Sequence, residues 1–227
     1  MKLNDLSLLT VTFNNNLLTG MMLMSFYKQA GFMPPTVIVD NGTYIQADES
    51  MRRVFHVVDN FSHKLLPDEK QASRNHCVAI DYALKNSIQT KWVLLVDNDI
   101  LFYPSIRPFL LNFNAEDYQC AGEIGYDDTP PNRLFPYFCL IDVEQFNKDK
   151  INYFDRSRIT SFCTVGVPES RDRRLNVMDT GYSFYEDIKN IWNIFDFRIN
   201  TVCVHLKSAM LAHKDIGIWF TEHTDLL

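Results

Sequence analysis

The chain has 227 residues and a net charge of −6, with 46% hydrophobic and 22% charged residues, a composition typical of an ordinary soluble globular protein. The acidic balance argues against a nucleic-acid partner, because nucleic-acid-binding chains are usually basic. No apolar run approaches the roughly 20 residues of a membrane span, so we expect no spanning helix, while peripheral association with a membrane surface stays open.

The first half of the chain alternates strand-like and helix-like segments. We expect strands at 6–13, 36–42, 53–60 and 92–97, and helices at 17–31 and 73–87. Because these strands are apolar on both faces, they should form a parallel sheet that helices cover on both sides. The expected fold class is therefore α/β, with a doubly wound, mainly parallel sheet flanked by helices.

The second half is less regular. Residues 126–146 begin as a proline-rich loop and continue as a strand-like run, and 170–179 read as a polar loop. Apolar residues at helical spacing predict a helix over 181–195, and a last strand is expected at 199–206. No linker separates two independent units, so we expect a single domain over 1–227.

The five cysteines lie apart in apolar runs, without any C-x-x-C pair. This pattern indicates reduced core cysteines and favours a reducing, cytoplasmic compartment. The apolar run in "MKLNDLSLLTVTF" is short and interrupted by polar residues, so no signal peptide is expected.

Polar residues follow three of the predicted strands at the point where each strand ends. They are Asn14 and Asn15, Asp40 and Asn41, and residues 97–99. In a doubly wound sheet the ligand binds at the carboxyl ends of the strands, so these side chains predict one shared site.

The stretch "KWVLLVDNDILFYP" places two carboxylates at the end of the most hydrophobic strand. If the strand geometry continues, Asp97 and Asp99 point to one side and Asn98 to the other. Two adjacent carboxylates repel each other unless a cation lies between them. Mg²⁺ or Mn²⁺ takes such oxygen ligands and keeps positions open for substrate phosphates, so we predict a metal that holds a diphosphate. The alternative is that the two aspartates only cap a turn.

Four motifs in this order, "VTFNN", "VIVDNG", "SRNHCVAIDYAL" and "WVLLVDND", resemble those of an inverting-type, GT-A-fold nucleotide-sugar glycosyltransferase of family 2. The resemblance covers the first half well and the second half loosely. It implies a nucleotide-diphosphate sugar donor, with a UDP-sugar expected, and a glycan or lipid-linked acceptor. It also implies that residues 1–103 bind the donor and 104–220 the acceptor, in the cytoplasm or at the inner face of a membrane.

The same resemblance implies roles for single residues. Asp40 would bind the base or ribose, Arg74 would reach the diphosphate from a helix start, and Asp99 would ligate the metal directly. The glycine that often precedes the arginine is absent from "PDEKQASRN". The residues implied to contact the donor are Thr12, Phe13, Asn14, Asp40, Arg74, Asn75, Asp97 and Asn98, and the implied metal ligands are Asp97, Asp99 and His205.

An inverting transfer also needs a general base that deprotonates the acceptor hydroxyl. The resemblance points to Asp179, just before the predicted helix, although an aspartate there can equally be a helix N-cap. Glu186 and Asp187 are weaker candidates, and a retaining enzyme would need no such base. His213 competes with His205 as the metal ligand.

Several further residues have weaker assignments. Three other histidines precede the acidic pair, and we expect no role for them: His56, His63 and His76. Side chains that could bind acceptor hydroxyls or stack on a sugar are Tyr126, Asp127, Asp128, Arg133, Tyr137 and Phe138. Arg171, Arg173 and Arg174 could close over the diphosphate. An ordinary surface loop explains each of these groups equally well.

Three other functions fit parts of the sequence. A haloacid-dehalogenase-like phosphohydrolase also carries D-x-D after a buried strand. In that family the motif lies near the start of the chain, and the residue two positions after the second aspartate is usually Thr or Val, where this chain has Leu101. A nucleotidyltransferase would need a glycine-rich loop after "LLTVTF", where this chain has none. A non-catalytic module that binds a sugar nucleotide stays open as well.

Overall fold

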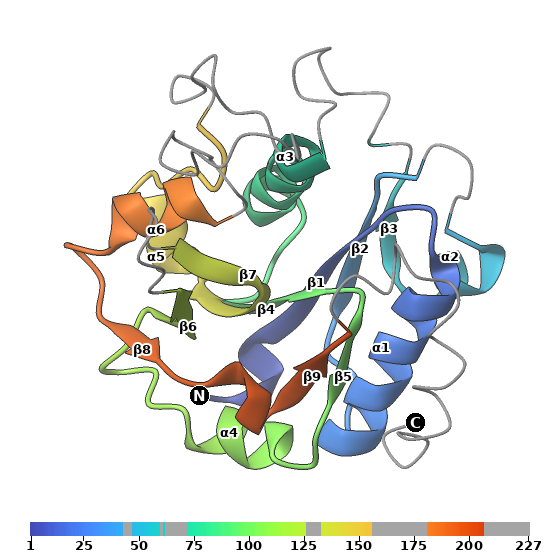
Figure 1. The fold of residues 1–227 in the computed structure, drawn as a ribbon, viewed down its shortest axis with the longest axis horizontal. Helices are drawn as coiled ribbons and strands as arrows, with labels where there is room; N and C mark the ends of the chain where they lie inside the picture. The colour runs from blue at the N-terminus through green and yellow to red at the C-terminus, as the bar shows by residue number, and fades with distance from the viewer. Residues whose placement is uncertain (43–46, 60, 62–71, 126–132, 156–180, 207–227) are drawn as a thin grey trace, which may run out of the picture.

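The computed structural model describes residues 1–42, 47–59, 61, 72–125, 133–155 and 181–206 (Figure 1). Its helices are α1 (Asn16–Ala30), α2 (Glu49–Val54), α3 (Ala72–Asn86), α4 (Ile106–Asn112), α5 (Val143–Lys148) and α6 (Tyr182–Ile188). Its strands are β1 (Leu6–Thr12), β2 (Thr36–Asp40), β3 (His56–Val58), β4 (Trp92–Asp97), β5 (Ile100–Phe102), β6 (Cys120–Gly125), β7 (Arg133–Asp142), β8 (Ile194–Asp196) and β9 (Cys203–His205). Among the described residues, no helix is both long and apolar enough to cross a membrane.

Seven strands form the central sheet, in the order β3-β2-β1-β4-β7-β6-β8. The pairs β3–β2, β2–β1, β1–β4 and β6–β8 are parallel, whereas β7 is antiparallel to both β4 and β6. Only β7 therefore runs against the other strands of this sheet. The predicted doubly wound, mainly parallel α/β fold is confirmed.

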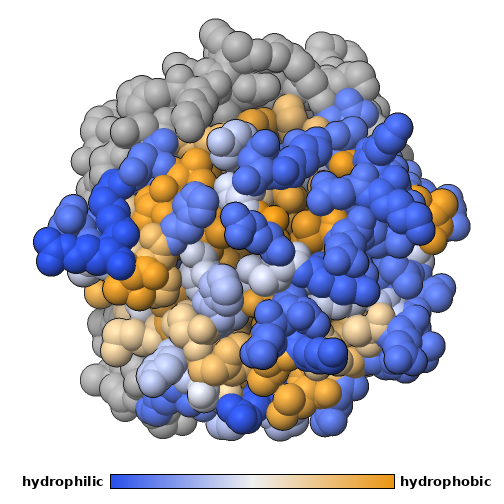
Figure 2. Space-filling view, turned by 180° about the vertical axis from the view of Figure 1, so that it is seen from behind, coloured by the Kyte–Doolittle hydropathy of each residue, from blue (hydrophilic) through white to orange (hydrophobic). Residues whose placement is uncertain are grey.

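The central strands are buried on both faces, which is why they read as continuous apolar runs. Successive residues of β1 belong to opposite core layers: Leu9 packs in the layer of α3, and Leu8 in the layer of α1. The first layer also holds residues of α5 and α6, and the second those of α4 and the β5–β9 ribbon. On the face opposite to the one seen in Figure 1, the surface carries mainly hydrophilic residues with apolar groups between them (Figure 2).

A separate two-stranded antiparallel sheet is formed by β5 and β9 (Figure 1). Its register pairs Ile100 with His205 and Phe102 with Cys203. The ring of Phe102 packs edge-on against Phe26 of α1, with 5.0 Å between the ring centroids. This ribbon begins directly after the acidic pair, and it places the end of β9 beside that pair.

Two predicted strand boundaries are wrong, one in each half of the chain. The strand expected at 53–60 is shorter, because α2 extends to Val54 and β3 covers only His56–Val58. Asp48 explains the helix, since its side chain accepts a hydrogen bond from the backbone N–H of Met51 and caps the first turn. The strand-like run after the proline-rich loop is confirmed by β7, but it ends at Asp142, which caps α5 in the same way.

The helix expected at 181–195 is also wrong in its second half. Helix α6 ends at Ile188, and residues Ile194–Asp196 instead form β8, which pairs with β6. Asn193 is held in this path because its backbone N–H donates to the side chain of Gln119. A tertiary edge pairing thus overrides the local helical spacing. The strand expected at 199–206 is likewise shorter, since Ile199–Thr201 form a 3₁₀ turn before β9.

Candidate functional site

The acidic pair lies at the carboxyl edge of the parallel strands, as the sequence predicts. Asp97 is the last residue of β4, and Asn98 and Asp99 form a two-residue turn before β5. Asp99 is buried, with 7% of its surface exposed, while Asp97 is partly exposed. Two neighbouring carboxylates in this setting favour a bound cation.

His205 completes a cluster with these two aspartates. Its Nε2 lies 3.1 Å from Oδ1 of Asp99, and one ligand atom from each of the three residues lies within 4.8 Å of the others. The ribbon produces this contact, because Ile100 pairs with His205 and the backbone N–H of Leu206 donates to the carbonyl of Asp99 at 2.8 Å. Strand pairing therefore brings together residues about a hundred positions apart in the sequence.

The cluster has the chemistry of a divalent metal site. Neighbouring ligands in an octahedral shell with bonds of about 2.1 Å lie roughly 3 Å apart, which agrees with the separation of His205 and Asp99. Two carboxylates suit Mg²⁺ or Mn²⁺, and the imidazole favours Mn²⁺ of the two. The three predicted ligands thus fit a metal ion.

Asn98 has a different environment from its neighbours. It is 5% exposed, and its side-chain amide donates to the hydroxyl of Thr19 on α1 at 3.2 Å. The Thr19 hydroxyl also lies 2.9 Å from the hydroxyl of Thr12 at the end of β1. This buried network ties the acidic turn to β1 and α1. Contact of Thr12 and Asn98 with the donor stays a prediction.

Residues after β1 form the entrance to α1. Phe13 is 45% exposed, Asn14 has a left-handed backbone with φ of 53°, and Asn15 accepts a hydrogen bond from the N–H of Leu18. The left-handed residue turns the chain sharply, which leaves the ring of Phe13 uncovered beside the strand ends. An exposed aromatic ring in this position suits stacking on a nucleobase.

Asp40 is fully buried and already bound within the protein. Its two oxygens accept hydrogen bonds from the backbone N–H groups of Gly42, at 2.8 Å, and Ala47, at 2.6 Å. The carboxylate therefore holds the chain that follows β2. Its predicted contact with the base or ribose stays a prediction.

Asn41, the residue after Asp40, lies next to Asn75 of α3. The Asn41 amide group donates to the backbone carbonyl of Asn75 at 3.4 Å, and both side chains are buried. Neither amide oxygen receives a hydrogen bond from the described part of the protein. A buried acceptor without a donor is costly, so a donor group on a ligand would stabilise both. The side chain of Arg74 is outside the described residues.

His76 lies beside the acidic pair, a contact that no sequence pattern predicts. Its Nε2 lies 3.5 Å from Oδ1 of Asp97, and its side chain is 24% exposed. It stands on α3 one residue after Asn75, so the helix that was predicted for the donor site carries it to the acidic pair. Only the three-dimensional packing of α3 reveals this contact.

Aromatic rings lie on the other side of the metal cluster. The Tyr137 ring is stacked between Phe135, with centroids 5.1 Å apart, and His205, with centroids 4.7 Å apart. Both faces of Tyr137 are thus covered, which leaves no face for the suggested sugar stacking. Burial, followed by the nearby Glu123 carboxylate, raises the pKa of Tyr137 to about 12, so the phenol is neutral at physiological pH. The other suggested ring, Phe138, is fully buried in the core.

Several predicted residues lie outside the described ranges: Asp179, His213, His63, Tyr126, Asp127, Asp128, Arg171, Arg173 and Arg174. Gly181 is the first described residue after Asp179. It has φ of 88°, and an added Cβ would lie 2.1 Å from the carbonyl oxygen of Leu134, so α6 begins tightly against β7. Glu186 pairs with Lys189 on the surface of α6, as expected for a solvated acid.

Comparison with known proteins gives matches among solved structures only; the sequence matches no family description and no curated protein. The mannosyltransferase PcManGT from Pyrobaculum calidifontis, in complex with GDP-Man and Mn²⁺, matches with a TM-score of 0.55 and 11% identity over 85% of this chain. An active-site mutant of LgtC matches with a TM-score of 0.51 and 14% identity over 85% of this chain and 73% of that one. The chain has the GT-A glycosyltransferase fold. This fold does not favour the phosphohydrolase alternative.

The chain spans little more than half of some of these structures. It covers 54% of PcManGT and 59% of LgtC in a complex with donor and acceptor sugar analogues. At identities this low the comparison establishes the fold, whereas donor, acceptor and metal follow only from the residues of the site.

Proposed function

We propose that this protein is a metal-dependent glycosyltransferase that moves a sugar from a nucleotide-diphosphate donor to a hydroxyl group of a glycan or lipid-linked acceptor. The observation that carries the proposal is the cluster of Asp97, Asp99 and His205 at the carboxyl edge of a GT-A sheet. These three residues would hold Mn²⁺ or Mg²⁺. When bound there, the ion supplies positive charge that neutralises the leaving diphosphate.

The donor nucleotide would bind beside this cluster, over the ends of β1 and β2. The exposed ring of Phe13 would stack on the base, and the buried amide oxygens of Asn41 and Asn75 would accept hydrogen bonds from the base or ribose. The start of α3 adds partial positive charge on the same side, which favours a diphosphate. A UDP-sugar is the first donor to test. GDP-mannose is the second, because it is bound to the structural neighbour PcManGT.

The acceptor would approach from the side of β7 and α6. Asp179 precedes α6, and we assign it as the base that takes the proton from the attacking hydroxyl. Gly181, two residues after that aspartate, lies in close contact with Leu134 of β7, which supports this assignment.

Thermal unfolding with nucleotides tests the proposal. UDP or GDP at about 100 times its Kd should stabilise the protein by about 2.7 kcal/mol, a rise in Tm of roughly 5–10 °C, and only when Mn²⁺ is present. A panel of nucleotide sugars then identifies the donor by release of the nucleotide. Stabilisation that persists in EDTA would contradict the metal-dependent mode of binding, and no stabilisation by any nucleotide diphosphate would contradict the transferase proposal.

A further inference from the structure

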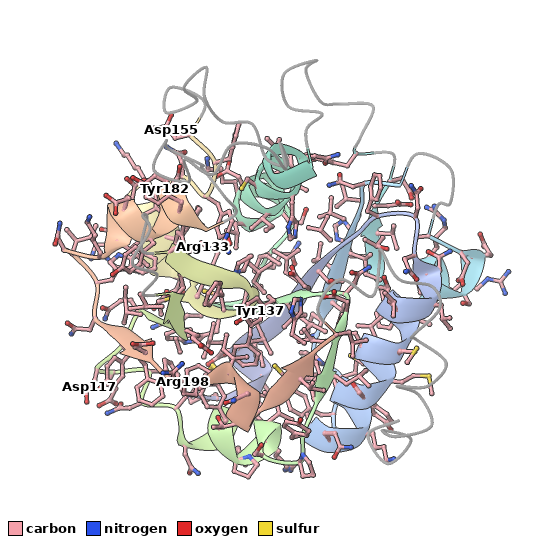
Figure 3. The ribbon with its side chains drawn as sticks, in the orientation of Figure 1. Asp117, Arg133, Tyr137, Asp155, Tyr182 and Arg198 are labelled. Carbon is pink, nitrogen blue, oxygen red and sulfur yellow. The ribbon has the colours of Figure 1, made fainter. Side chains whose placement is uncertain are left out.

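The row of side chains Arg133, Phe135 and Tyr137 on β7 extends beyond the end of β4. The register between β4 and β7 ends where Phe138 pairs with Val96. The stack of Tyr137 on His205 places the Tyr137 ring at the acidic pair. Figure 3 shows Tyr137 beside β5 and β9, with Arg133 farther along β7. This end of β7 therefore forms a wall next to the metal cluster.

Four side chains stack in sequence along this wall. The Arg133 guanidinium lies 5.1 Å from the centre of the Phe135 ring, Phe135 stacks on Tyr137, and Tyr137 stacks on His205. The planes of Tyr137 and His205 are 15° apart, so the imidazole lies nearly flat on the phenol ring. Gly125 makes room for the row, because a Cβ there would lie 2.8 Å from the Phe135 ring.

His205 depends on such support more than the other two ligands do. Asp97 ends a strand of the central sheet, whereas His205 stands on the three-residue β9, which pairs only with the equally short β5 in the described structure. Its ring is 26% exposed, and free rotation about its two side-chain torsions would turn Nε2 away from Asp99 for part of the time. A ligand that points correctly for only a fraction of the time lowers the apparent affinity by that fraction.

We infer that Tyr137 is a positioning residue that clamps the imidazole of His205 by ring stacking and thereby sets the affinity of the metal site. The inference rests on the proposed function, because it needs a metal at the cluster. It goes beyond that function because it assigns the orientation of His205 to a residue of β7. The stacking face of Tyr137 carries this role, and its hydroxyl group is dispensable.

The experiment is a titration with Mn²⁺, without nucleotide, in which free Mn²⁺ is measured by electron paramagnetic resonance. Tyr137→Phe keeps the ring and should bind Mn²⁺ within about two-fold of wild type. Tyr137→Leu removes the stack and should bind it about 10- to 100-fold more weakly, the range typical for loss of a group that orients a metal ligand. Tyr118→Leu is the matched control, because Tyr118 packs on Phe113 and Phe195, at the other end of β6, and should leave the affinity unchanged.

A double-mutant cycle separates positioning from general damage to the fold. In a His205→Ala background, Tyr137→Leu should cause no further loss of Mn²⁺ affinity, because its effect passes through the imidazole. A further loss there, or wild-type affinity in Tyr137→Leu alone, would overturn the clamp while leaving the metal site intact. Lack of Mn²⁺ binding by the wild-type protein would overturn the site and the clamp together.

A measurement on the wild-type protein covers the case in which Tyr137→Leu does not fold. Stacking at the observed distance places the ring protons of His205 over the phenol, so their nuclear magnetic resonance signals should be shifted upfield in the metal-free protein. Unshifted signals would show that the rings are not stacked in solution and would refute the clamp.

Discussion

The two sides of the central sheet differ in how they are built. On the proposed donor side, β3, β2, β1 and β4 are parallel and are connected through helices. On the proposed acceptor side, β7 is antiparallel to both of its neighbours, and β8 pairs with β6 at the edge of the sheet. The metal cluster lies where the two sides meet, with two ligands from the donor side and one from the peripheral ribbon.

This difference separates two properties of the site. Asp97 ends β4, and Asp99 follows it in the turn before β5, so the proposed carboxylate ligands depend mainly on the most buried strand. The orientation of His205 and the proposed approach of the acceptor depend on β7, β9 and α6, which rest on aromatic contacts and a tight glycine turn. We therefore expect donor-side changes to abolish binding, and acceptor-side changes to weaken affinity or transfer while the donor still binds.

The largest effect is expected for Asp99→Asn. The amide keeps the size of the side chain but removes the charge that binds the cation, so Mn²⁺-dependent binding of a nucleotide diphosphate should fall at least about 100-fold and transfer should be lost. Calorimetric titration measures the binding. Asp117→Asn is the control, since this exposed residue precedes the amino end of β6 and lies far from Tyr137 in Figure 3. Unchanged binding in Asp99→Asn would remove Asp99 from the site.

Asp179→Asn tests the acceptor side alone. Loss of a general base should lower the rate of transfer by about 10²- to 10⁴-fold, while donor binding stays within a factor of about two. Steady-state rates and donor titrations measure the two quantities separately. If donor binding falls together with the rate, Asp179 is a structural residue and the base lies elsewhere.

A pair of glycine substitutions compares the stability of the two sides. Gly181→Ala forces a side chain onto a left-handed backbone and against the Leu134 carbonyl, so it should cost about 1–3 kcal/mol or more of unfolding free energy. Gly20→Ala lies in α1, where the nearest atom is 3.8 Å from the added Cβ, and should be neutral or up to about 1 kcal/mol stabilising. Urea unfolding measures both. Equal stability of the two variants would contradict the tight packing of α6 on β7.

The smallest effect concerns Asp149, which joins α5 to the end of α6. Hydrogen bonds from Gln145 and from the Trp192 indole N–H lower the pKa of this carboxyl from 3.8. A lowered pKa in the folded state means that the bonds add stability above the ordinary pKa and lose it as the pH falls through the lowered one. Asp149→Asn should therefore reduce the acid dependence of Trp192 fluorescence below pH 4 or so. An unchanged acid transition would show that the contact adds no stability.

Sequence patterns predicted the donor side well, because strands buried on both faces leave continuous apolar runs and polar residues mark their ends. The pattern around Asp97 and Asp99 therefore predicted where the two carboxylates lie, and their cluster with His205 could hold a metal ion. The contact of His76 with Asp97 was missed, because it depends on which face α3 turns to the sheet. The burial of Asp40 against the backbone of Gly42 and Ala47 was also hidden, since it depends on the path of the following loop.

The acceptor side was predicted less well for a physical reason. Residues 194–196 have the spacing of a helix, but the edge of β6 offers hydrogen-bonding groups that stabilise a strand there. The ring sandwich around Tyr137 joins β7 to β9, and no local pattern relates residues so far apart. Contacts between residues far apart in the sequence determine β8 and the ring stack, and the local pattern of a single sequence does not contain those contacts.

The pairing of β5 with β9 also sets the order in which parts of the site form during synthesis on the ribosome. Strands β1 to β4 lie within residues 6–97, about a hundred residues before β9, so they can collapse into a sheet while β9 is still being synthesised. His205 is translated about a hundred residues after Asp99, and the histidine cannot join the aspartates until β9 has left the exit tunnel. A nascent chain can therefore fold the sheet before it unites the three proposed ligands, and the proposed cation site is complete only after β9 has been synthesised.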